Sequence, residues 1–146
     1  MAPDMSKSPF AKAEVVPPGN TTFRKNNLMI STSQQFASDD FCYLTTIGRA
    51  TGQPHTIEIW FALDGRTLYM LSGSHTSDWV KNLLRMPDVT LRLGETTFAG
   101  RARVVAQADE DAQARKLVVA KYQPRSSDDL SGWGRIALPV AVDLEE

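Results

Sequence analysis

Residues 41–73, FCYLTTIGRATGQPHTIEIWFALDGRTLYMLSG, decide the fold. Three runs rich in β-branched and aromatic residues alternate with two turn signals, which predicts three antiparallel strands. The first turn is GRATGQP at 48–54, and the second is Asp64-Gly65, a strong hairpin signal. Side chains that alternate along 55–63 predict one continuous strand with an inner and an outer face, which is typical of a barrel wall.

The rest of the chain adds helices and further strands. Residues 74–87, SHTSDWVKNLLRMP, have helical periodicity, polar residues that can cap the start, and a proline stop. Residues 108–122 predict a second helix with acids in its first turn. Three more strands are expected, at 88–93, at 96–105 and within 132–144, where a turn precedes the last strand. The predicted fold is therefore mainly β (α+β), a split antiparallel β-barrel of about six strands with flanking helices.

Composition narrows the class of protein. With 146 residues, 42% hydrophobic and 23% charged, the chain suits one globular domain, which we place at 23–146 after a flexible N-terminal arm at 1–22. A net charge of −1 creates no positive electrostatic potential that would attract nucleic acid, so we expect small-molecule partners. Contact with a membrane surface stays open. The sequence contains no long apolar run, which predicts no transmembrane segment and a cytoplasmic location.

Metal and nucleophilic chemistry find little support. The two histidines, His55 and His75, lie far apart in sequence, and the single cysteine, Cys42, sits in an apolar run typical of a buried side chain. There is no nucleophile-elbow motif with a matching acid and base. We therefore predict no metal site and assign no catalytic residue.

Two loops carry the pattern of an anion site. In the turn at 48–54, glycines expose backbone N–H groups, Thr51 adds a hydroxyl and Arg49 adds a planar fork of donors, although the same residues also suit an ordinary hairpin. Residues 72–79, SGSHTSDW, place small side chains before a helix start. If the second and third strands are neighbours, both loops flank one groove with an apolar wall, which predicts a phosphorylated aromatic cofactor such as FMN or a deazaflavin.

The ordered series in residues 41–142 resembles the deazaflavin-dependent nitroreductase family of split β-barrel proteins, which are relatives of flavin-binding proteins of the pyridoxamine-phosphate-oxidase type. It consists of LTTIGRATGQPHTIEIWFALDGRTLYMLSG, DWVKNLLRMPDVTLRLG and GRARVV. The resemblance implies a homodimeric oxidoreductase that binds coenzyme F420. It also implies hydride transfer from the reduced cofactor to a quinone, nitroaromatic or activated enone, with the protein mainly orienting ring and acceptor.

The resemblance also assigns roles by position. Four residues of the first turn would hold the phosphate and the acidic tail: Arg49, Thr51, Gln53 and His55. The following strand would line the ring with Ile57, Glu58, Ile59 and Trp60. Backbone donors would come from Ser72, Gly73 and Ser74, and the helix would close the groove with Trp79, Asn82 and Leu83. The acceptor side would include Trp133 and Tyr122.

Two positions depart from the family pattern. Many members carry Lys where this chain has Ala50 and Arg where it has His55. Losing two charge-assisted contacts of about 1.5–3 kcal/mol each would weaken binding of the tail more than tenfold. Two other functions therefore stay open: a non-catalytic binding protein for F420, FMN, haem or a lipid-like ligand, and an FMN-dependent oxidoreductase.

Overall fold

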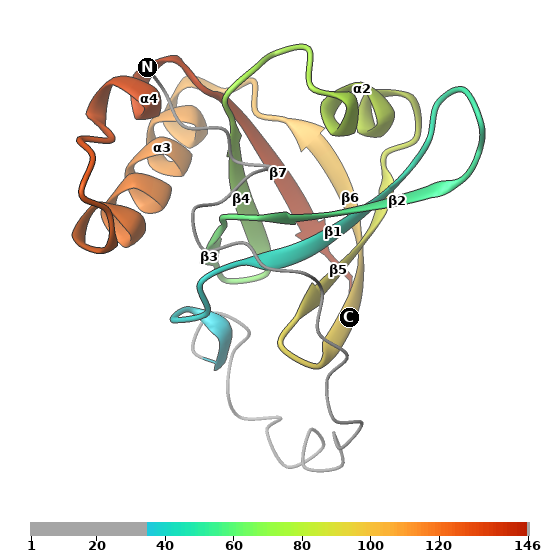
Figure 1. The fold of residues 1–146 in the computed structure, drawn as a ribbon, viewed down its shortest axis with the longest axis horizontal. Coiled ribbons are helices and arrows are strands. Elements are labelled where there is room, and N and C mark those ends of the chain that lie inside the picture. The colour runs from blue at the N-terminus through green and yellow to red at the C-terminus, as the bar shows by residue number, and fades with distance from the viewer. Residues whose placement is uncertain (1–34, 146) are drawn as a thin grey trace.

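A computed structural model of the chain describes residues 35–145 (Figure 1). The predicted arm at 1–22 and the first part of the predicted domain, 23–34, lie outside the described residues. The described strands form one seven-stranded antiparallel sheet in the order β2-β1-β5-β6-β7-β4-β3. Their bounds are β1 Cys42–Ile47, β2 Pro54–Ile59, β3 Ala62–Asp64, β4 Thr67–Ser72, β5 Asp88–Leu93, β6 Thr96–Val104 and β7 Leu138–Leu144.

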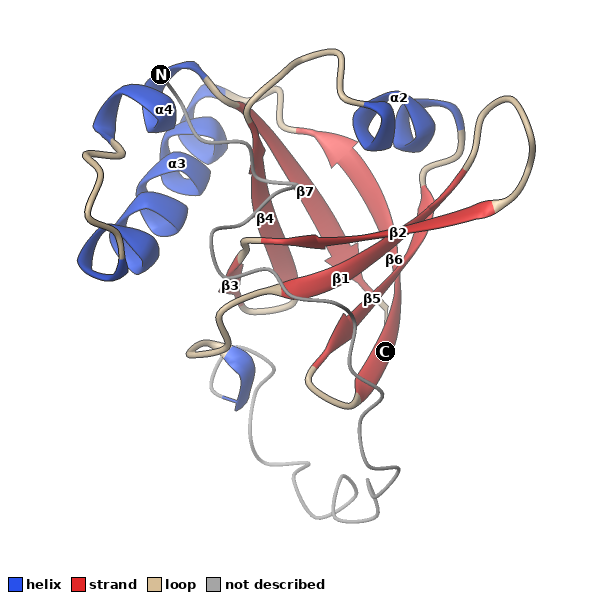
Figure 2. Ribbon diagram, in the orientation of Figure 1, coloured by secondary structure: helices blue, strands red, loops and turns tan. Residues whose placement is uncertain are grey.

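The strand expected at 55–63 is two strands, which corrects the sequence prediction. Trp60 and Phe61 follow one another and are both buried, so the alternation of inner and outer side chains fails there. The chain then passes from β2, which pairs with β1, to β3, which pairs with β4 at the other edge of the sheet. This crossing curls the sheet into a half-barrel, and the predicted fold class is confirmed with seven strands (Figure 2).

Helices lie at two places around the half-barrel. The helix α2, Asp78–Arg85, contacts β1 and β6, whereas α3, Ala108–Tyr122, contacts β3, β4 and β7 (Figure 1). A short 3-10 helix, η3 Gln123–Arg125, follows α3. The helix α4, Ser131–Ile136, was expected as a turn before the last strand. It forms because Trp133 and Gly134 are buried when this segment coils, and α4 packs against α3.

An aromatic cluster holds the break between β2 and β3. The ring of Trp60 stacks on that of Tyr122 at 4.3 Å and 4°, and meets Trp133 edge-on at 5.9 Å and 90°. The Tyr122 hydroxyl donates to the Asp40 carbonyl at 2.6 Å and accepts from the Phe61 N–H at 3.1 Å. These contacts satisfy the backbone N–H that leaves the sheet ladder at Phe61, and they tie α3 and α4 to this point.

Lys121 and Cys42 lie beside the same break. The Lys121 ammonium donates to the Phe61 carbonyl at 3.0 Å and sits 3.6 Å from the centre of the Phe61 ring. Burial lowers the pKa of Lys121 to about 8, with the nearby Arg125 charge acting in the same direction. Burial raises the pKa of the Cys42 thiol, which is fully buried as the sequence predicts. Cys42 is therefore an inert packing residue.

A charged network fixes the start of α3 to the sheet. Arg103 forms two parallel bonds to Glu110, Nη1 to Oε1 at 2.7 Å and Nη2 to Oε2 at 2.8 Å, and its Nε donates to Asp143 at 2.8 Å. Tyr69 donates to Glu110 at 2.8 Å. The bonds from Arg103 and then Tyr69 lower the pKa of Glu110 to about 2 from its ordinary 4.5. The ionised form of Glu110 is thus the one that the fold binds.

The network makes the stability of the fold depend on acid pH. Because the pKa of Glu110 is depressed in the folded state, its contribution is complete above 4.5 and is lost as pH falls towards about 2. We expect Glu110→Gln to lower the free energy of unfolding at pH 7 by roughly 1 kcal/mol. The difference from the wild type should shrink across that acid window, as measured by urea unfolding at a series of pH values.

The matched control is Asp109→Asn, which removes an exposed acid from the same first turn of α3. It loses the same interaction with the helix dipole but no part of the network. Equal pH profiles for the two variants would show that the network contributes nothing.

Candidate functional site

A groove opens between the β1–β2 turn and the first turns of α2. It encloses about 700 Å³, within the range of cofactor sites. One wall comes from β1, β2 and their turn, and the other from the N-terminal half of α2. The lining residues are Thr46, Gly48, Arg49, Ala50, Thr51, His55, Thr56, Ile57, Ser77, Asp78, Trp79 and Asn82.

The turn is folded by its own backbone. Gly48 N–H donates to the Gln53 carbonyl at 2.7 Å, and Gly52 N–H donates to the Gly48 carbonyl at 2.8 Å. Gly52 has φ +74°, a value that side chains rarely tolerate. A Cβ on Gly48 would lie 2.8 Å from both His55 Nε2 and Thr51 Oγ1. Glycine at 48 therefore lets the imidazole and the hydroxyl close over the backbone.

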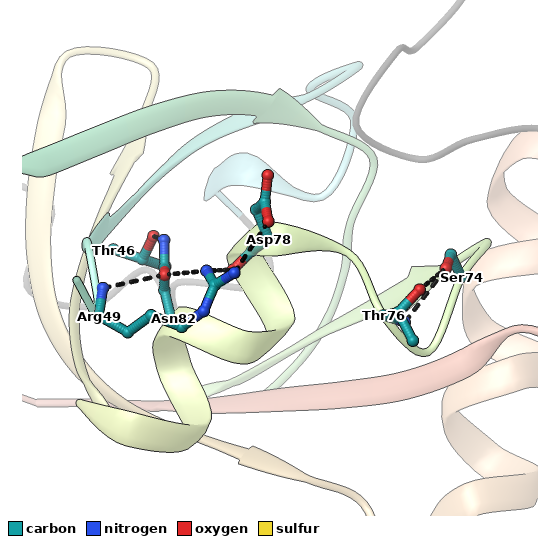
Figure 3. A network of polar contacts seen from close by, with 6 residues as sticks. All are labelled: Thr46, Arg49, Ser74, Thr76, Asp78 and Asn82. Carbon is teal, nitrogen blue, oxygen red and sulfur yellow. Dashed lines mark hydrogen bonds and ion pairs between the residues drawn. The ribbon is translucent and has the colours of Figure 1, made fainter.

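Asn82 connects the helix wall to the strand wall. Its side chain is 4% exposed, and its Oδ1 accepts from the Arg49 backbone N–H at 3.1 Å and from Arg49 Nη1 at 2.8 Å (Figure 3). Its Nδ2 donates to Thr46 Oγ1 at 3.2 Å. One buried amide thus holds β1, the turn and α2 at fixed separations, and it orients the Arg49 guanidinium.

Arg49 also forms an ion pair across the groove. Its Nη2 lies 3.2 Å from Asp78 Oδ1, with the two side chains 36% and 86% exposed. Its Nη1 approaches the Asp78 carbonyl at 3.5 Å (Figure 3). The Nε–H makes no hydrogen bond within residues 35–145, whereas Nη2 is bonded to Asp78. A guanidinium edge made of Nε and Nη2 has the geometry to bind a phosphate or carboxylate through two parallel bonds.

Two residues make part of the lining apolar. Trp79 is 5% exposed, and Ile57 is half-buried. Within the described part of the chain the Trp79 Nε1–H is buried without a hydrogen-bond partner. An unpaired buried donor costs about 1–3 kcal/mol. The lining combines apolar side chains with a guanidinium, so it suits a ligand that has an aromatic part and an anionic part.

The loop before α2 has a bracing role. Ser72 Oγ donates to the Ser74 carbonyl at 2.5 Å and lies 3.0 Å from Ser77 Oγ. Ser74 Oγ lies 3.0 Å from Thr76 Oγ1 (Figure 3). Ser77 occupies the N-cap position, but its hydroxyl makes no capping bond to the helix. The loop thus fixes the start of α2 through hydroxyls that face the loop itself.

The structure brings together six of the residues assigned from the sequence. They are Arg49, Thr51, His55, Ile57, Trp79 and Asn82. Eight others lie outside the lining: Gln53, Glu58, Ile59, Trp60, Ser72, Gly73, Ser74 and Leu83. For the residues of and after β4 the reason is the split strand: β2 pairs with β1 and not with β4, so the groove forms beside β1.

Three of the assigned residues have other partners. Glu58 accepts from the Tyr43 hydroxyl at 2.9 Å on neighbouring strands. Trp133 and Tyr122, expected on the acceptor side, are buried in the aromatic cluster under α3 and α4. Neither of these two lines the groove.

Sequence reasoning missed Thr46 and Asp78 in particular. Both had a readable signal. Thr46 pairs with His55 in the β1–β2 register, so an assignment of His55 to the wall implies Thr46 beside it. Asp78 precedes Asn82 by one helical turn, so the two side chains share a face of α2.

Other site classes find no support in residues 35–145. In this range no group of three or more His, Cys, Asp or Glu side chains is arranged to hold a metal ion. No helix in the same range is both long and apolar enough to cross a membrane. The groove is thus the feature on which a function can be argued.

A half-barrel with flanking helices and a groove of cofactor size between the β1–β2 turn and α2 is the architecture of a split-barrel protein. The chain belongs to the F420H(2)-dependent quinone reductase family, whose model matches residues 19–145. It is therefore an F420-dependent oxidoreductase with coenzyme F420 as its cofactor. No curated protein matches the sequence.

Solved structures share the fold at low identity. An F420-H2 dependent reductase is 19% identical with a TM-score of 0.58, covering 73% of this chain and 95% of its own. A Listeria innocua protein assigned as a pyridoxamine 5′-phosphate oxidase is 18% identical with a TM-score of 0.56, covering 73% of this chain and 85% of its own. The heme storage protein HutZ from Vibrio cholerae is 19% identical with a TM-score of 0.57, covering 77% of this chain and 87% of its own. The three have different described functions, so the fold by itself does not select the ligand.

The contacts of Asn82 predict a coupled loss of stability. We expect Asn82→Ala to lower the free energy of unfolding by about 1–3 kcal/mol, because Thr46 and the Arg49 N–H lose a buried partner. In the Arg49→Ala background the same change should cost less, since one of the bonds is already absent. Urea unfolding of the wild type, the two single variants and the double variant measures the coupling. Additive costs would show that the hydrogen bonds between Asn82 and Arg49 do not act together.

Proposed function

We propose that this protein binds coenzyme F420 in the groove between the β1–β2 turn and α2. The anionic end of the cofactor would bind at Arg49, Thr51 and His55, and the ring would lie along Trp79 and Ile57. The reduced cofactor supplies a hydride, which the enzyme would deliver to a small quinone, nitroaromatic or activated enone. The acceptor and the binding position are both part of this proposal.

One observation carries the proposal. A single groove is lined by the Arg49 guanidinium and by the apolar side chains of Trp79 and Ile57. A phosphate or carboxylate matches the guanidinium, and an aromatic ring matches the apolar side chains. Coenzyme F420, the cofactor of the family, combines both features in one molecule.

The residues of the groove would act by position and charge. Asn82 orients Arg49, and Arg49 would fix the anionic end of the cofactor. The half-buried wall at Ile57 and Trp79 would exclude water from the ring. Such positioning is most of what a protein must add to a cofactor that carries its own hydride chemistry. No side chain of the lining is assigned as a general acid.

Ala50 and His55 make this groove weaker for anions than the family pattern. Both line it, so the expected loss of two cations falls at the proposed site. The anionic end would rely on Arg49, the Thr51 hydroxyl and backbone N–H groups of the turn. We therefore expect the protein to hold the tail of F420 loosely and to draw most of its affinity from the ring.

Two other functions are separated by direct measurements. Protein purified from a deazaflavin-producing host should absorb near 420 nm, the wavelength of the cofactor's name, whereas FMN gives a pair of flavin bands. Oxidation of reduced F420 by menadione or a nitroaromatic separates a reductase from a carrier. The homodimer, the cytoplasmic location and peripheral membrane contact remain predictions.

Removing the guanidinium tests the proposed anion site. We expect Arg49→Ala to weaken F420 binding by about 1.5–3 kcal/mol, because a charge-assisted bidentate contact is lost. Arg49→Lys should fall in between, since it keeps the charge without the fork. Fluorescence titration measures the dissociation constants. Arg101→Ala, which removes an exposed arginine paired with Asp88 outside the groove, is the control; equal constants for both alanine variants would refute the site.

Adding a cation tests the path of the tail. Ala50→Lys places an ammonium in the lining beside Arg49 and should tighten F420 binding by about 1 kcal/mol, the value of a partly exposed charge contact. The same titration with increasing salt should remove the gain. No gain at low salt would mean that the tail does not pass this turn.

A further inference from the structure

We propose that Asp78 determines the charge specificity of the groove by competing with the ligand's anionic end for Arg49. This inference rests on the proposed function, because it concerns binding at the same site. In the structure Asp78 occupies a position next to the arginine where a phosphate or carboxylate would bind. It is a built-in anion that the ligand must displace or tolerate.

The geometry makes Asp78 the mobile partner of this pair. Asn82 holds the Arg49 side chain at 2.8 Å and its backbone N–H at 3.1 Å, and Asn82 is buried. The Asp78 side chain is 86% exposed, and Arg49 is its one ion-pair partner within residues 35–145. Asp78 is therefore the partner that can move when an anion approaches, while the guanidinium keeps its place.

The formal charges of the groove lining determine how Asp78 affects ligands of different charge. Among the lining residues the formal charges are those of Arg49 and Asp78, which cancel while His55 is neutral. A bound anion at the Nε–Nη2 edge would remain close to the Asp78 carboxylate, which bonds to the same Nη2. Repulsion between these like charges grows with the charge of the ligand. Asp78 thus disfavours heavily charged tails and leaves binding of the neutral ring unaffected.

The test compares three variants with two ligands. Asp78→Asn removes the charge and keeps the shape, and Asp78→Glu keeps the charge. Asp88→Asn is a matched control, since Asp88 pairs with Arg101 at the same 3.2 Å distance on the exposed surface. The ligands are oxidised F420 and its neutral deazaflavin fragment without phosphate or glutamyl tail. Fluorescence titration at low and high salt gives the dissociation constants, and thermal unfolding checks that each variant is folded.

We expect Asp78→Asn to bind F420 about three- to tenfold tighter than the wild type at low salt. The fragment should bind the wild type and Asp78→Asn equally. Asp88→Asn should match the wild type with both ligands, and Asp78→Glu, which keeps the charge, should show no gain. The gain should fade at about 1 M salt, where the screening length is roughly 3 Å.

The outcomes separate this inference from the proposed function. If F420 binds the wild type, and Arg49→Ala weakens it, but Asp78→Asn changes nothing, the site stands and the inference on Asp78 is overturned. Weaker binding by Asp78→Asn would also overturn it, because the carboxylate would then help the ligand. If F420 does not bind the wild type, or Arg49→Ala has no effect, the proposed function fails and this inference fails with it.

Discussion

The burial of two successive aromatic side chains, Trp60 and Phe61, is the constraint on which the remaining structure depends. A strand cannot place neighbours on one face, so the chain must leave the ladder at this point. Tyr122 accepts the freed N–H of Phe61 and stacks on Trp60, so the break is bonded as well as packed. The break places β2 and β3 at opposite edges of the sheet. Because β2 then pairs only with β1, the groove forms between their turn and α2.

Much of the fold could be predicted from local patterns. Period-two alternation and turn residues located the strands, and the start and stop signals located α2 and α3. The break at Trp60 was missed because the face of His55, Ile57 and Ile59 was extended to Phe61, although residues 59–63, IWFAL, are all apolar and no longer alternate. The short helix α4 was missed for another reason: GWGRI has poor helical propensity, and it coils because Trp133 packs against Trp60. The helix α4 is thus a case in which tertiary packing overrode a local signal.

The candidate site shows the same division. Residues near the turn and on α2 were predicted correctly to line the groove because short sequence patterns identify them: a glycine turn, an arginine and an apolar helix face. Residues assigned on the assumption that β2 and β4 are neighbours, such as Ser72 and Trp60, were not brought to the groove. The ion pair of Arg49 with Asp78 joins positions 29 residues apart, so the pattern around Arg49 did not identify its partner; the helical spacing of Asp78 and Asn82 was the available signal. The balanced net charge of the chain predicted only that any anion site must be formed by a few local residues.

The Asn82 amide has a consequence for how this groove can change over time. Positions 46, 49 and 82 share one set of buried bonds, so a substitution at any of them alters the cost of substitutions at the other two. A lineage would therefore exchange them together or keep them together. Asp78 is attached to this unit by a single exposed contact and can vary alone. Positions 46, 49 and 82 are thus expected to change slowly in evolution, whereas position 78 can change alone. A single substitution at position 78 would be enough to alter the preference of the groove for ligand charge.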